Sequence, residues 1–215
     1  MKVYHYWRSS CSWRVRWALR LLNIPHELVP VDLRTGEQHS EAHLKRNPMG
    51  FVPVIQWEDE AQKKQTLSDS IAILRFLDQT HSPSTFGIFP KSPQVEANVN
   101  ELVGIIASGT QPVANLGVMK FHSKDPSEQK KWAQHWIDKG LSAYERSLEG
   151  VAGTFSVGDQ LTAADLCLIP QCYNATRFGL DLNAYPKIQT INANCLKTEA
   201  CQLSAPENYK PKDFE

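Results

Sequence analysis

Residues 3–22 read VYHYWRSSCSWRVRWALRLL, and within them an extended pattern gives way to a helical one. Val3–Trp7 is rich in aromatic and β-branched side chains with period-2 character, which predicts a strand. From Ser12 to Leu22, apolar side chains recur at the i, i+3, i+4 and i+7 spacing of an amphipathic helix. These apolar residues are Val15, Ala18, Leu19 and Leu22. The stretch therefore predicts a β-α unit at the start of the chain.

The residues that follow extend this unit into an α/β domain. The predicted elements are strands at Leu28–Leu33, Val52–Trp57 and Gln65–Leu67 and a short helix at Asp69–Leu77. The element order is roughly β-α-β-α-β-β-α, which assigns residues 1–82 to one α/β domain. A segment rich in proline and serine comes next, and residues 83–93 are the predicted linker.

Residues 94–215 show helical patterns without a convincing strand, so they predict an all-helical domain. Helices are expected at Gln94–His122, Pro126–Leu148, Thr162–Arg177 and Pro186–Glu199. Gly109 and Pro112 are expected to disturb the first of them. Thr162-Ala163-Ala164-Asp165 matches a capping box in which aspartate replaces the usual glutamate, and this indicates a structural role.

The charge balance argues against two classes of function. The 215 residues include 23 basic and 23 acidic side chains, so the formal net charge is zero. Nucleic-acid-binding proteins and polybasic membrane-surface proteins ordinarily carry a basic excess, so we expect neither partner. The N-terminus lacks the apolar core of a secretory signal, and the longest apolar run, around Leu102–Ala107, is far too short to span a bilayer.

The cysteines argue for a reducing compartment. They are Cys11, Cys167, Cys172, Cys195 and Cys201. Their number is odd, their spacing is uneven, and they form no C-x-x-C pair, which argues against a disulfide framework or a zinc site. The histidines are scattered as well. We therefore expect a cytoplasmic protein with reduced thiols and no metal.

The segment Ser9-Ser10-Cys11-Ser12 lies where the first strand passes into the first helix. The free backbone N–H groups and the positive end of a helix stabilise an anion there, including a thiolate. Serine is also a favoured N-cap residue, so the same pattern fits plain helix capping. Position 14 is Arg14 rather than a second cysteine, which disfavours dithiol redox chemistry.

Two later segments also allow either a purely structural or a ligand-binding interpretation. Pro53 enters an apolar strand, either as an edge residue or as a cis proline that exposes the backbone of Val52. Asp69 and Ser70 open a helix, either as caps or as groups that meet a ligand.

Taken together, the motifs resemble the zeta class of glutathione transferases, the maleylacetoacetate isomerase family, almost from end to end. The box S-S-C-S-W-R-V-R at Ser9–Arg16 is specific to that class. The other matching segments are N-P-M-x-x-V-P at Asn47–Pro53, S-I-A-I-L from Ser70, G-T-Q-P-V-A-N-L at Gly109–Leu116, A-D-L-C-L-I-P-Q at Ala164–Gln171, N-A-T-R-F at Asn174–Phe178 and D-L-N-A-Y-P-K-I from Asp181.

The resemblance implies a thioredoxin-like N-terminal domain that holds glutathione as a cofactor, plus an all-α C-terminal domain that completes the substrate pocket. It also implies a homodimer. Ser9, Ser10 and Cys11 are the implied catalytic residues beside the glutathione sulfur. The implied glutathione contacts are these three with Ser12, Gln38, Val52, Pro53, Asp69, Ser70, Gln111 and Asn115. The family often has glutamine at the position of Asp69, where a carboxylate also suits the γ-glutamyl ammonium group.

The implied reaction is the glutathione-dependent conversion of maleylacetoacetate to fumarylacetoacetate in tyrosine and phenylalanine catabolism. The thiolate adds to the double bond, the resulting single bond rotates, and elimination returns glutathione. The substrate is a dianionic diketo acid, whose carboxylates we expect Arg8 and Arg177 to bind. Three alternatives stay open. They are a maleylpyruvate isomerase, a broad transferase acting on α-halo acids or peroxides, and a non-catalytic interaction protein.

Overall fold

The computed structural model describes residues 1–83 and 87–214. The chain divides into two compact units, one formed by Met1–Thr85 with Glu199–Glu215 and the other by Phe86–Thr198. The sequence had assigned residues 199–215 to the helical domain, so their membership of the first unit is a difference from expectation. Residues 84–86 of the predicted linker lie outside the described residues.

The first unit is built on a mixed four-stranded sheet. Its strands are β1 (Lys2–His5), β2 (Glu27–Pro30), β3 (Val54–Glu58) and β4 (Lys64–Ser68). The strand order is β2-β1-β3-β4, with β1 parallel to β2 and antiparallel to β3, and β3 antiparallel to β4. Val3 pairs with Leu28 on one side and with Ile55 on the other. Because side chains alternate across a strand, this register keeps Val3 and Ile55 fully buried.

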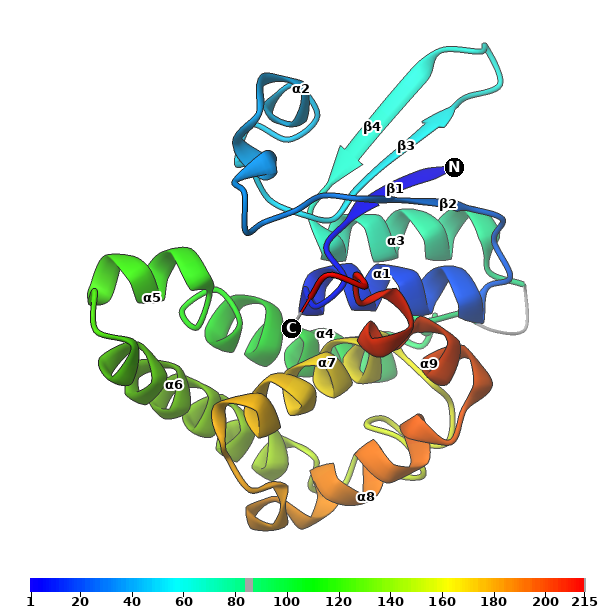
Figure 1. The fold of residues 1–215 in the computed structure, drawn as a ribbon. Helices are drawn as coiled ribbons and strands as arrows, with labels where there is room; N and C mark the ends of the chain where they lie inside the picture. Colours follow the sequence, from blue (N-terminus) through cyan, green and yellow to red (C-terminus); the bar gives the residue numbers. More distant parts are fainter. Residues whose placement is uncertain (84–86, 215) are drawn as a thin grey trace. The chain divides into compact units, whose positions relative to one another are not determined.

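The helices of this unit complete the expected β-α-β-α-β-β-α order. They are α1 (Ser10–Leu21), the 3₁₀ turn η1 (Glu37–His39), α2 (Glu41–Leu44), α3 (Ser70–His81), α9 (Glu199–Ser204) and the 3₁₀ turn η4 (Pro206–Tyr209). Helices α1 and α3 lie side by side against one face of the sheet (Figure 1). The predicted α/β class is confirmed.

Helix α1 differs from the predicted amphipathic helix because it is buried on more than one side. Val15, Ala18 and Leu19 are fully buried as expected, but Trp17 and Arg16 are fully buried too. The helix packs against α3 and also against α9, which comes from the end of the chain. The C-terminal segment therefore covers the α1 face that the sequence pattern had left to solvent.

Arg16 contacts three segments of the first unit. Its Nε donates to the carbonyl of Ser204 at 3.1 Å, its Nη2 donates to the carbonyl of Trp7 at 3.0 Å, and its Nη1 lies 3.2 Å from Nδ1 of His5. Its guanidinium also lies over the Tyr209 ring, 4.7 Å from the centroid. Burial lowers the pKa of Arg16 to about 10. The arginine thereby links β1, the turn before α1 and the C-terminal segment.

The second unit is helical, as predicted. Its elements are α4 (Pro93–Gly104), the π-helical turn η2 (Ile105–Thr110), α5 (Leu116–His122), α6 (Pro126–Ser147), α7 (Ala163–Phe178), the 3₁₀ turn η3 (Leu182–Ala184) and α8 (Pro186–Leu196). The interruption expected near Gly109 and Pro112 is the π-helical turn and the loop after it. Thr110 in that turn lies against α6, where a Cβ on Gly140 would be 1.9 Å from Oγ1 of Thr110.

The predicted capping box at the start of α7 is confirmed. Asp165 is fully buried, and its carboxylate accepts hydrogen bonds from the backbone N–H groups of Thr162 and Ser156, each at 2.8 Å. Burial raises the pKa of the Asp165 carboxyl above its ordinary value. The Ser156 hydroxyl in turn accepts from the Tyr144 hydroxyl at 2.9 Å. The box therefore holds the start of α7 onto the loop that follows α6.

Candidate functional site

The segment Ser9–Ser12, here called the serine box, forms the start of helix α1. Ser9 is the N-cap residue in extended conformation, and its Oγ accepts a hydrogen bond from the Ser12 N–H at 3.2 Å. The Ser12 hydroxyl accepts from the Tyr6 N–H at 3.3 Å and has no exposed surface. Capping, one of the two readings of this box, is therefore correct for Ser9. Complete burial and this bond give Ser12 a structural role, and its expected contact with glutathione stays a prediction.

Capping leaves two donors unused at the start of this helix. Among the described residues, the N–H groups of Ser10 and Cys11 have no hydrogen-bond partner. These N–H groups lie at the positive end of a 12-residue helix. The Cys11 thiol is free and half-buried, and Ser10 is 8% exposed. The arrangement favours an anion, so the ligand reading of the box is compatible with capping.

The loop before β3 presents an unpaired stretch of backbone. The Val52–Pro53 peptide bond is cis, which agrees with one of the two readings of Pro53. Strand pairing begins at Val54, and within the described residues neither the N–H nor the C=O of Val52 makes a hydrogen bond. Val52 therefore offers one donor and one acceptor to an extended peptide.

Asn47 holds this loop in place, and the sequence reasoning did not assign it a role. Its Nδ2 donates to the Phe51 carbonyl at 3.0 Å, and its Oδ1 accepts from the Met49 N–H at 3.1 Å. Nε2 of His43 also lies 3.0 Å from the Phe51 carbonyl. Asn47 is only 5% exposed, and its bond to the Phe51 carbonyl fixes the residue just before Val52. An Asn-Pro pair is a general turn signal, but it does not identify the partners of the asparagine side chain.

The start of α3 holds Asp69 and Ser70 together. Asp69 has a φ of 71°, which is rare for a residue with a side chain, and its Oδ1 caps the N–H groups of Ile71 and Ala72 at 2.9 and 3.0 Å. Its Oδ2 has no hydrogen-bond partner in the described part of the chain. Oγ of Ser70 accepts from Nη1 of Arg14 at 3.0 Å. Capping is thus confirmed for Asp69, and one carboxylate oxygen remains available.

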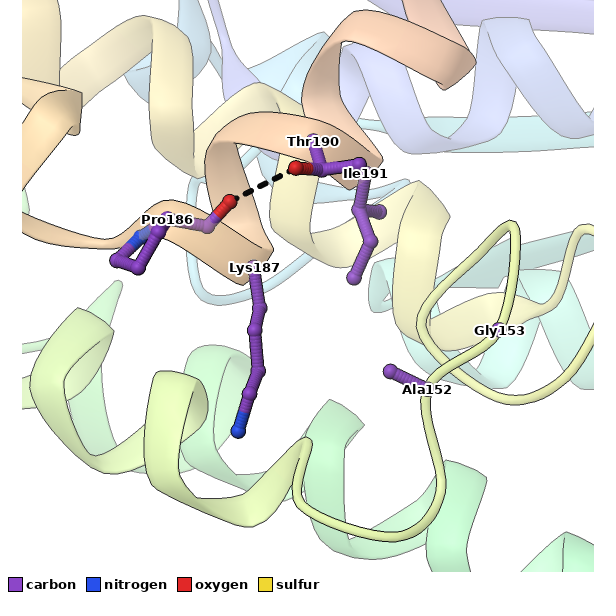
Figure 2. A pocket seen from close by; sticks show the side chains of 6 residues that line it. All are labelled: Ala152, Gly153, Pro186, Lys187, Thr190 and Ile191. Carbon is purple, nitrogen blue, oxygen red and sulfur yellow. Dashed lines mark hydrogen bonds between the residues drawn. The ribbon is translucent and has the colours of Figure 1, made fainter.

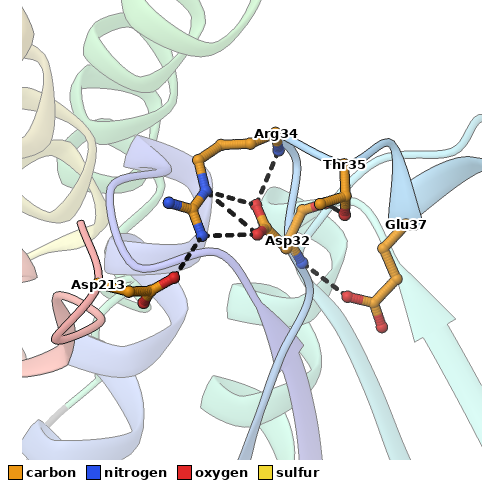
Figure 3. Close-up of polar contacts among 5 residues, drawn as sticks. All are labelled: Asp32, Arg34, Thr35, Glu37 and Asp213. Atoms are coloured by element: carbon orange, nitrogen blue, oxygen red, sulfur yellow. Dashed lines mark hydrogen bonds and ion pairs between the residues drawn. The ribbon is translucent and has the colours of Figure 1, made fainter. Parts of the chain in front are cut away.

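Gln38 lies in a loop that is held by its own charged residues. Oε1 of Gln38 is buried without a hydrogen-bond partner. Ahead of it, the Arg34 guanidinium contacts both carboxylate oxygens of Asp32, and Glu37 accepts from the Asp32 N–H at 2.7 Å (Figure 3). The hydrogen bond from Arg34 lowers the pKa of Asp32, and the same contact raises the pKa of Arg34. The loop is therefore ordered, and it holds an unsatisfied acceptor.

Arg8 precedes the serine box and has no anionic partner within residues 1–83 and 87–214. Its guanidinium lies 5.3 Å from the Trp7 ring centroid and 5.1 Å from that of Phe214. Among the described residues it makes no hydrogen bond or ion pair. A guanidinium that is stacked on two rings but not neutralised is a fitting carboxylate receptor.

The remaining predicted residues belong to the second unit. Half-buried Gln111 follows η2, and its N–H donates to the Ile106 carbonyl at 2.8 Å. Asn115 caps α5 through a 3.0 Å bond from the Gly117 N–H. Arg177 is exposed on α7, and its Nη1 donates to Oδ1 of Asn174 at 3.3 Å.

A cavity of about 310 Å³ also lies in the second unit, but it contains none of the predicted site residues. Its lining, drawn in Figure 2, is Ala152, Gly153, Pro186, Lys187, Thr190 and Ile191. Lys187 is paired with Glu149 there, and this ion pair lowers the pKa of the Glu149 carboxyl. Lys187, the charged residue of this lining, is therefore already paired.

The unsatisfied groups of the first unit fit a tripeptide that carries charges. The free donor and acceptor of Val52 match an extended peptide backbone. The two N–H groups at the start of α1 match an anionic sulfur, and the free oxygen of Asp69 matches an ammonium group. Gln38 contributes a further buried acceptor. These residues fit glutathione by the chemistry of their donor and acceptor sets.

Comparison with known proteins agrees with the family resemblance of the sequence motifs. A family model described as the N-terminal domain of glutathione S-transferase matches residues 8–80, and one described as the C-terminal domain matches residues 113–199. Maleylacetoacetate isomerase of Rattus norvegicus is 42% identical over 206 residues, covering 95% of this chain and 91% of that protein.

Two solved structures resemble the whole chain. Maleylacetoacetate isomerase from Anaeromyxobacter dehalogenans 2CP-1, solved with glutathione in its active site, is 38% identical with a TM-score of 0.88 and covers 100% of this chain and 97% of its own. A bacterial maleyl pyruvate isomerase of the zeta class is 31% identical with a TM-score of 0.89, and the match covers both chains completely. No helix in the described part of the chain has the length and apolarity needed to cross a bilayer.

Proposed function

Because the chain belongs to the maleylacetoacetate isomerase family of zeta-class glutathione transferases, we propose that it converts maleylacetoacetate to fumarylacetoacetate in tyrosine and phenylalanine catabolism. Its cofactor is glutathione. The observation that carries the proposal is the set of unsatisfied polar groups in the first unit, which fits a charged tripeptide beside an anion-binding helix end.

Residues of the first unit hold the tripeptide in this proposal. The backbone of Val52, beside cis Pro53, pairs with the cysteinyl part. Asp69 receives the γ-glutamyl ammonium group with its free oxygen, and Arg14 orients the Ser70 hydroxyl next to it. Gln38 accepts a hydrogen bond from the ligand. In the second unit, Gln111 and Asn115 supply the further polar contacts that the family resemblance implies.

The start of α1 keeps the sulfur charged. When bound, glutathione supplies a thiolate that adds reversibly to the substrate double bond, so that the bond can rotate. An unperturbed thiol has a pKa of about 8.5, and hydrogen bonds to the anion lower that value. The Ser9 hydroxyl can donate while its oxygen still caps the helix, and Ser10 and Cys11 add their free N–H groups and side chains.

Two arginines receive the substrate carboxylates. Arg8 is held by ring contacts with its N–H groups unused, and Arg177 is exposed on α7. A guanidinium binds a carboxylate through two parallel hydrogen bonds, so each arginine can orient one end of a dianion. We expect Arg177→Ala to raise the KM for the diketo acid more than that for a neutral electrophile. Equal effects on both substrates would remove Arg177 from carboxylate binding.

Maleylpyruvate isomerisation is the second candidate, favoured by the full-length likeness to a maleyl pyruvate isomerase. The chemistry is the same on a shorter acid. The presence of Cys11 in the serine box favours maleylacetoacetate, because relatives that act on the shorter acid can lack that cysteine. A broad transferase that acts on α-halo acids or peroxides is a further alternative.

The deciding experiment measures turnover of maleylacetoacetate and maleylpyruvate by the purified protein, with and without catalytic glutathione. Activity that requires glutathione without consuming it supports the isomerase, and the ratio of the two rates identifies the substrate. Failure to turn over either acid while glutathione still binds would refute the proposal in favour of the broad transferase. Absence of glutathione binding would leave a non-catalytic interaction protein.

Variants of the serine box test the individual roles. Ser9→Ala removes both the helix cap and the hydroxyl donor, so we expect about 1 kcal/mol lower stability and a reduced kcat. Ser9→Thr keeps both groups and should restore kcat. A Ser9→Ala enzyme with full activity would exclude the serine, and a fully active Cys11→Ala enzyme would exclude the thiol.

We also propose a homodimer located in the cytoplasm. The five cysteines are free, in keeping with a reducing compartment. The family resemblance supports the dimer. Sedimentation equilibrium should give twice the mass of one 24.3 kDa chain, and a monomer at micromolar concentration would contradict it.

A further inference from the structure

The end of the chain returns to the serine box. From Glu199 onward it belongs to the first unit, and α9 packs against α1. Trp13 donates from its Nε1 to the Ser204 hydroxyl at 3.0 Å, and the Tyr209 ring lies edge-on to His5 at 5.8 Å. The segment that leads to Phe214 is therefore anchored along its length rather than extending from the domain.

Phe214 lies among the residues at the entrance of the first helix. Its ring is edge-on to Trp7 with centroids 4.9 Å apart, and the Arg8 guanidinium lies 5.1 Å from its centroid. Arg34 and Lys210 approach the same ring at 5.1 and 5.6 Å. One phenyl ring thus contacts three cations, of which Arg34 is neutralised by acidic partners.

The residue before Phe214 contacts the loop that follows β2. Asp213 accepts from Nη2 of Arg34 at 3.3 Å, and the same guanidinium contacts Asp32 (Figure 3). This contact joins the tail to the loop that leads to Gln38. Since Arg8 has no hydrogen bond or ion pair among the described residues, the faces of Trp7 and Phe214 are what holds its guanidinium.

We propose that Phe214 is a positioning residue that holds Arg8 ready to bind a substrate carboxylate, so that the C-terminal tail contributes to selectivity for dianionic substrates. The inference rests on the proposed function for the identity of the substrate. A long arginine side chain loses rotational freedom when it binds, and contact with the two adjoining rings removes part of that cost in advance. Neither ring contact uses an N–H group in a hydrogen bond, so the N–H groups of the guanidinium are left for the carboxylate.

The test uses succinate, a four-carbon dicarboxylate that has no double bond for a thiol to attack. Its Kd is measured by calorimetry on the full-length, glutathione-saturated protein. Phe214→Leu keeps an apolar side chain but removes one cation–π contact. We expect this variant to raise the succinate Kd about 3- to 5-fold. Phe214→Tyr keeps the ring face and should retain the wild-type value. Lys212→Ala, an exposed tail residue without a contact to the ring, is the matched control and should change nothing.

The glutathione Kd and the kinetic constants separate positioning from general damage. We expect Phe214→Leu to raise the KM for the diketo acid by the same factor, with kcat and the glutathione Kd unchanged. A succinate Kd that stays at the wild-type value in Phe214→Leu would overturn the inference even if isomerisation is confirmed. If the wild-type protein turns over neither acid but binds succinate in a Phe214-dependent way, the proposed function fails and the positioning role stands.

Discussion

The buried pair His5–Arg16 predicts that acid destabilises the first unit well above the pH at which carboxylates titrate. His5 is 3% exposed, and its Nδ1 lies 3.2 Å from Nη1 of Arg16. Arginine can only donate, so Nδ1 must be the acceptor and the imidazole must be neutral. Burial, followed by the charges of Arg16 and His26, lowers the pKa of His5 from 6.5 to about 3.

The direction and size of the effect follow from this shift. Below pH 6.5 the unfolded chain binds a proton at His5 that the folded protein does not bind. Stability is therefore fully present above pH 6.5 and is lost as the pH falls towards 3. Between pH 7 and pH 5 the loss from His5 is about 2 kcal/mol. Because Arg16 also holds the Trp7 carbonyl, we expect the turn before the serine box to loosen in the same range.

The assay is urea unfolding at pH 7 and pH 5 at constant ionic strength, followed by tryptophan fluorescence. The control is His5→Asn, whose amide oxygen can accept from Arg16 but does not titrate. We expect the free energy of unfolding of the wild-type protein to fall by about 2 kcal/mol more than that of the variant. Burial also lowers the pKa of His26, but His26 is present in both proteins and cancels. An equal fall in both proteins would refute the reasoning.

Three further predictions concern positions where packing or capping is explicit. Gly140→Ala places a Cβ 1.9 Å from Oγ1 of Thr110, so we expect urea titration to show a free energy of unfolding about 1–3 kcal/mol lower. Gly104→Ala is the control, because its Cβ meets no atom within 4 Å and should not destabilise the protein. If Gly140→Ala were as stable as wild type, the close approach of α6 to η2 would be wrong. Asp165→Ala leaves two buried N–H groups without an acceptor and should lower the free energy of unfolding by about 3 kcal/mol. A loss below about 1 kcal/mol in the same measurement would contradict the capping box. Asp69→Ala should lower the midpoint of thermal unfolding, because about 1 kcal/mol of capping energy is lost. Asp69→Asn should largely retain the wild-type midpoint, because asparagine also caps helices and tolerates positive φ. Equal losses in both variants would exclude capping.

Local patterns predicted the elements well because their causes are local. The α/β order of the first unit, the helices of the second and the capping box at Thr162–Asp165 all follow from periodicity, caps and turn residues within a few positions. The same holds for the interruption near Gly109, where the chain forms a π-helical turn. The candidate glutathione contacts came from motif resemblance rather than from periodicity, because a cap and a ligand site use the same residue types.

Long-range packing was beyond the local pattern. The spacing of Val15, Ala18 and Leu19 indicates one buried face of α1, yet α9 buries another face along with Arg16. The sequence assigned Asn47 no role, and the carbonyl that it holds is identified only by the folded loop. Hydrogen bonds in the folded structure confirm capping by Ser9 and Asp69 and leave a ligand role open at both residues, while Ser12 is buried.

The amino-acid sequence determines which segments are strands and helices, the family to which the chain belongs, and the residue types available at the start of α1. Those properties depend on neighbours in the chain. The folded structure determines which polar groups remain unsatisfied at Val52, Gln38 and Arg8, and that Phe214, more than 200 positions after Arg8, lies against it. Hydrogen-bond satisfaction and ring contacts depend on distances between segments that are remote in sequence, which periodicity does not encode.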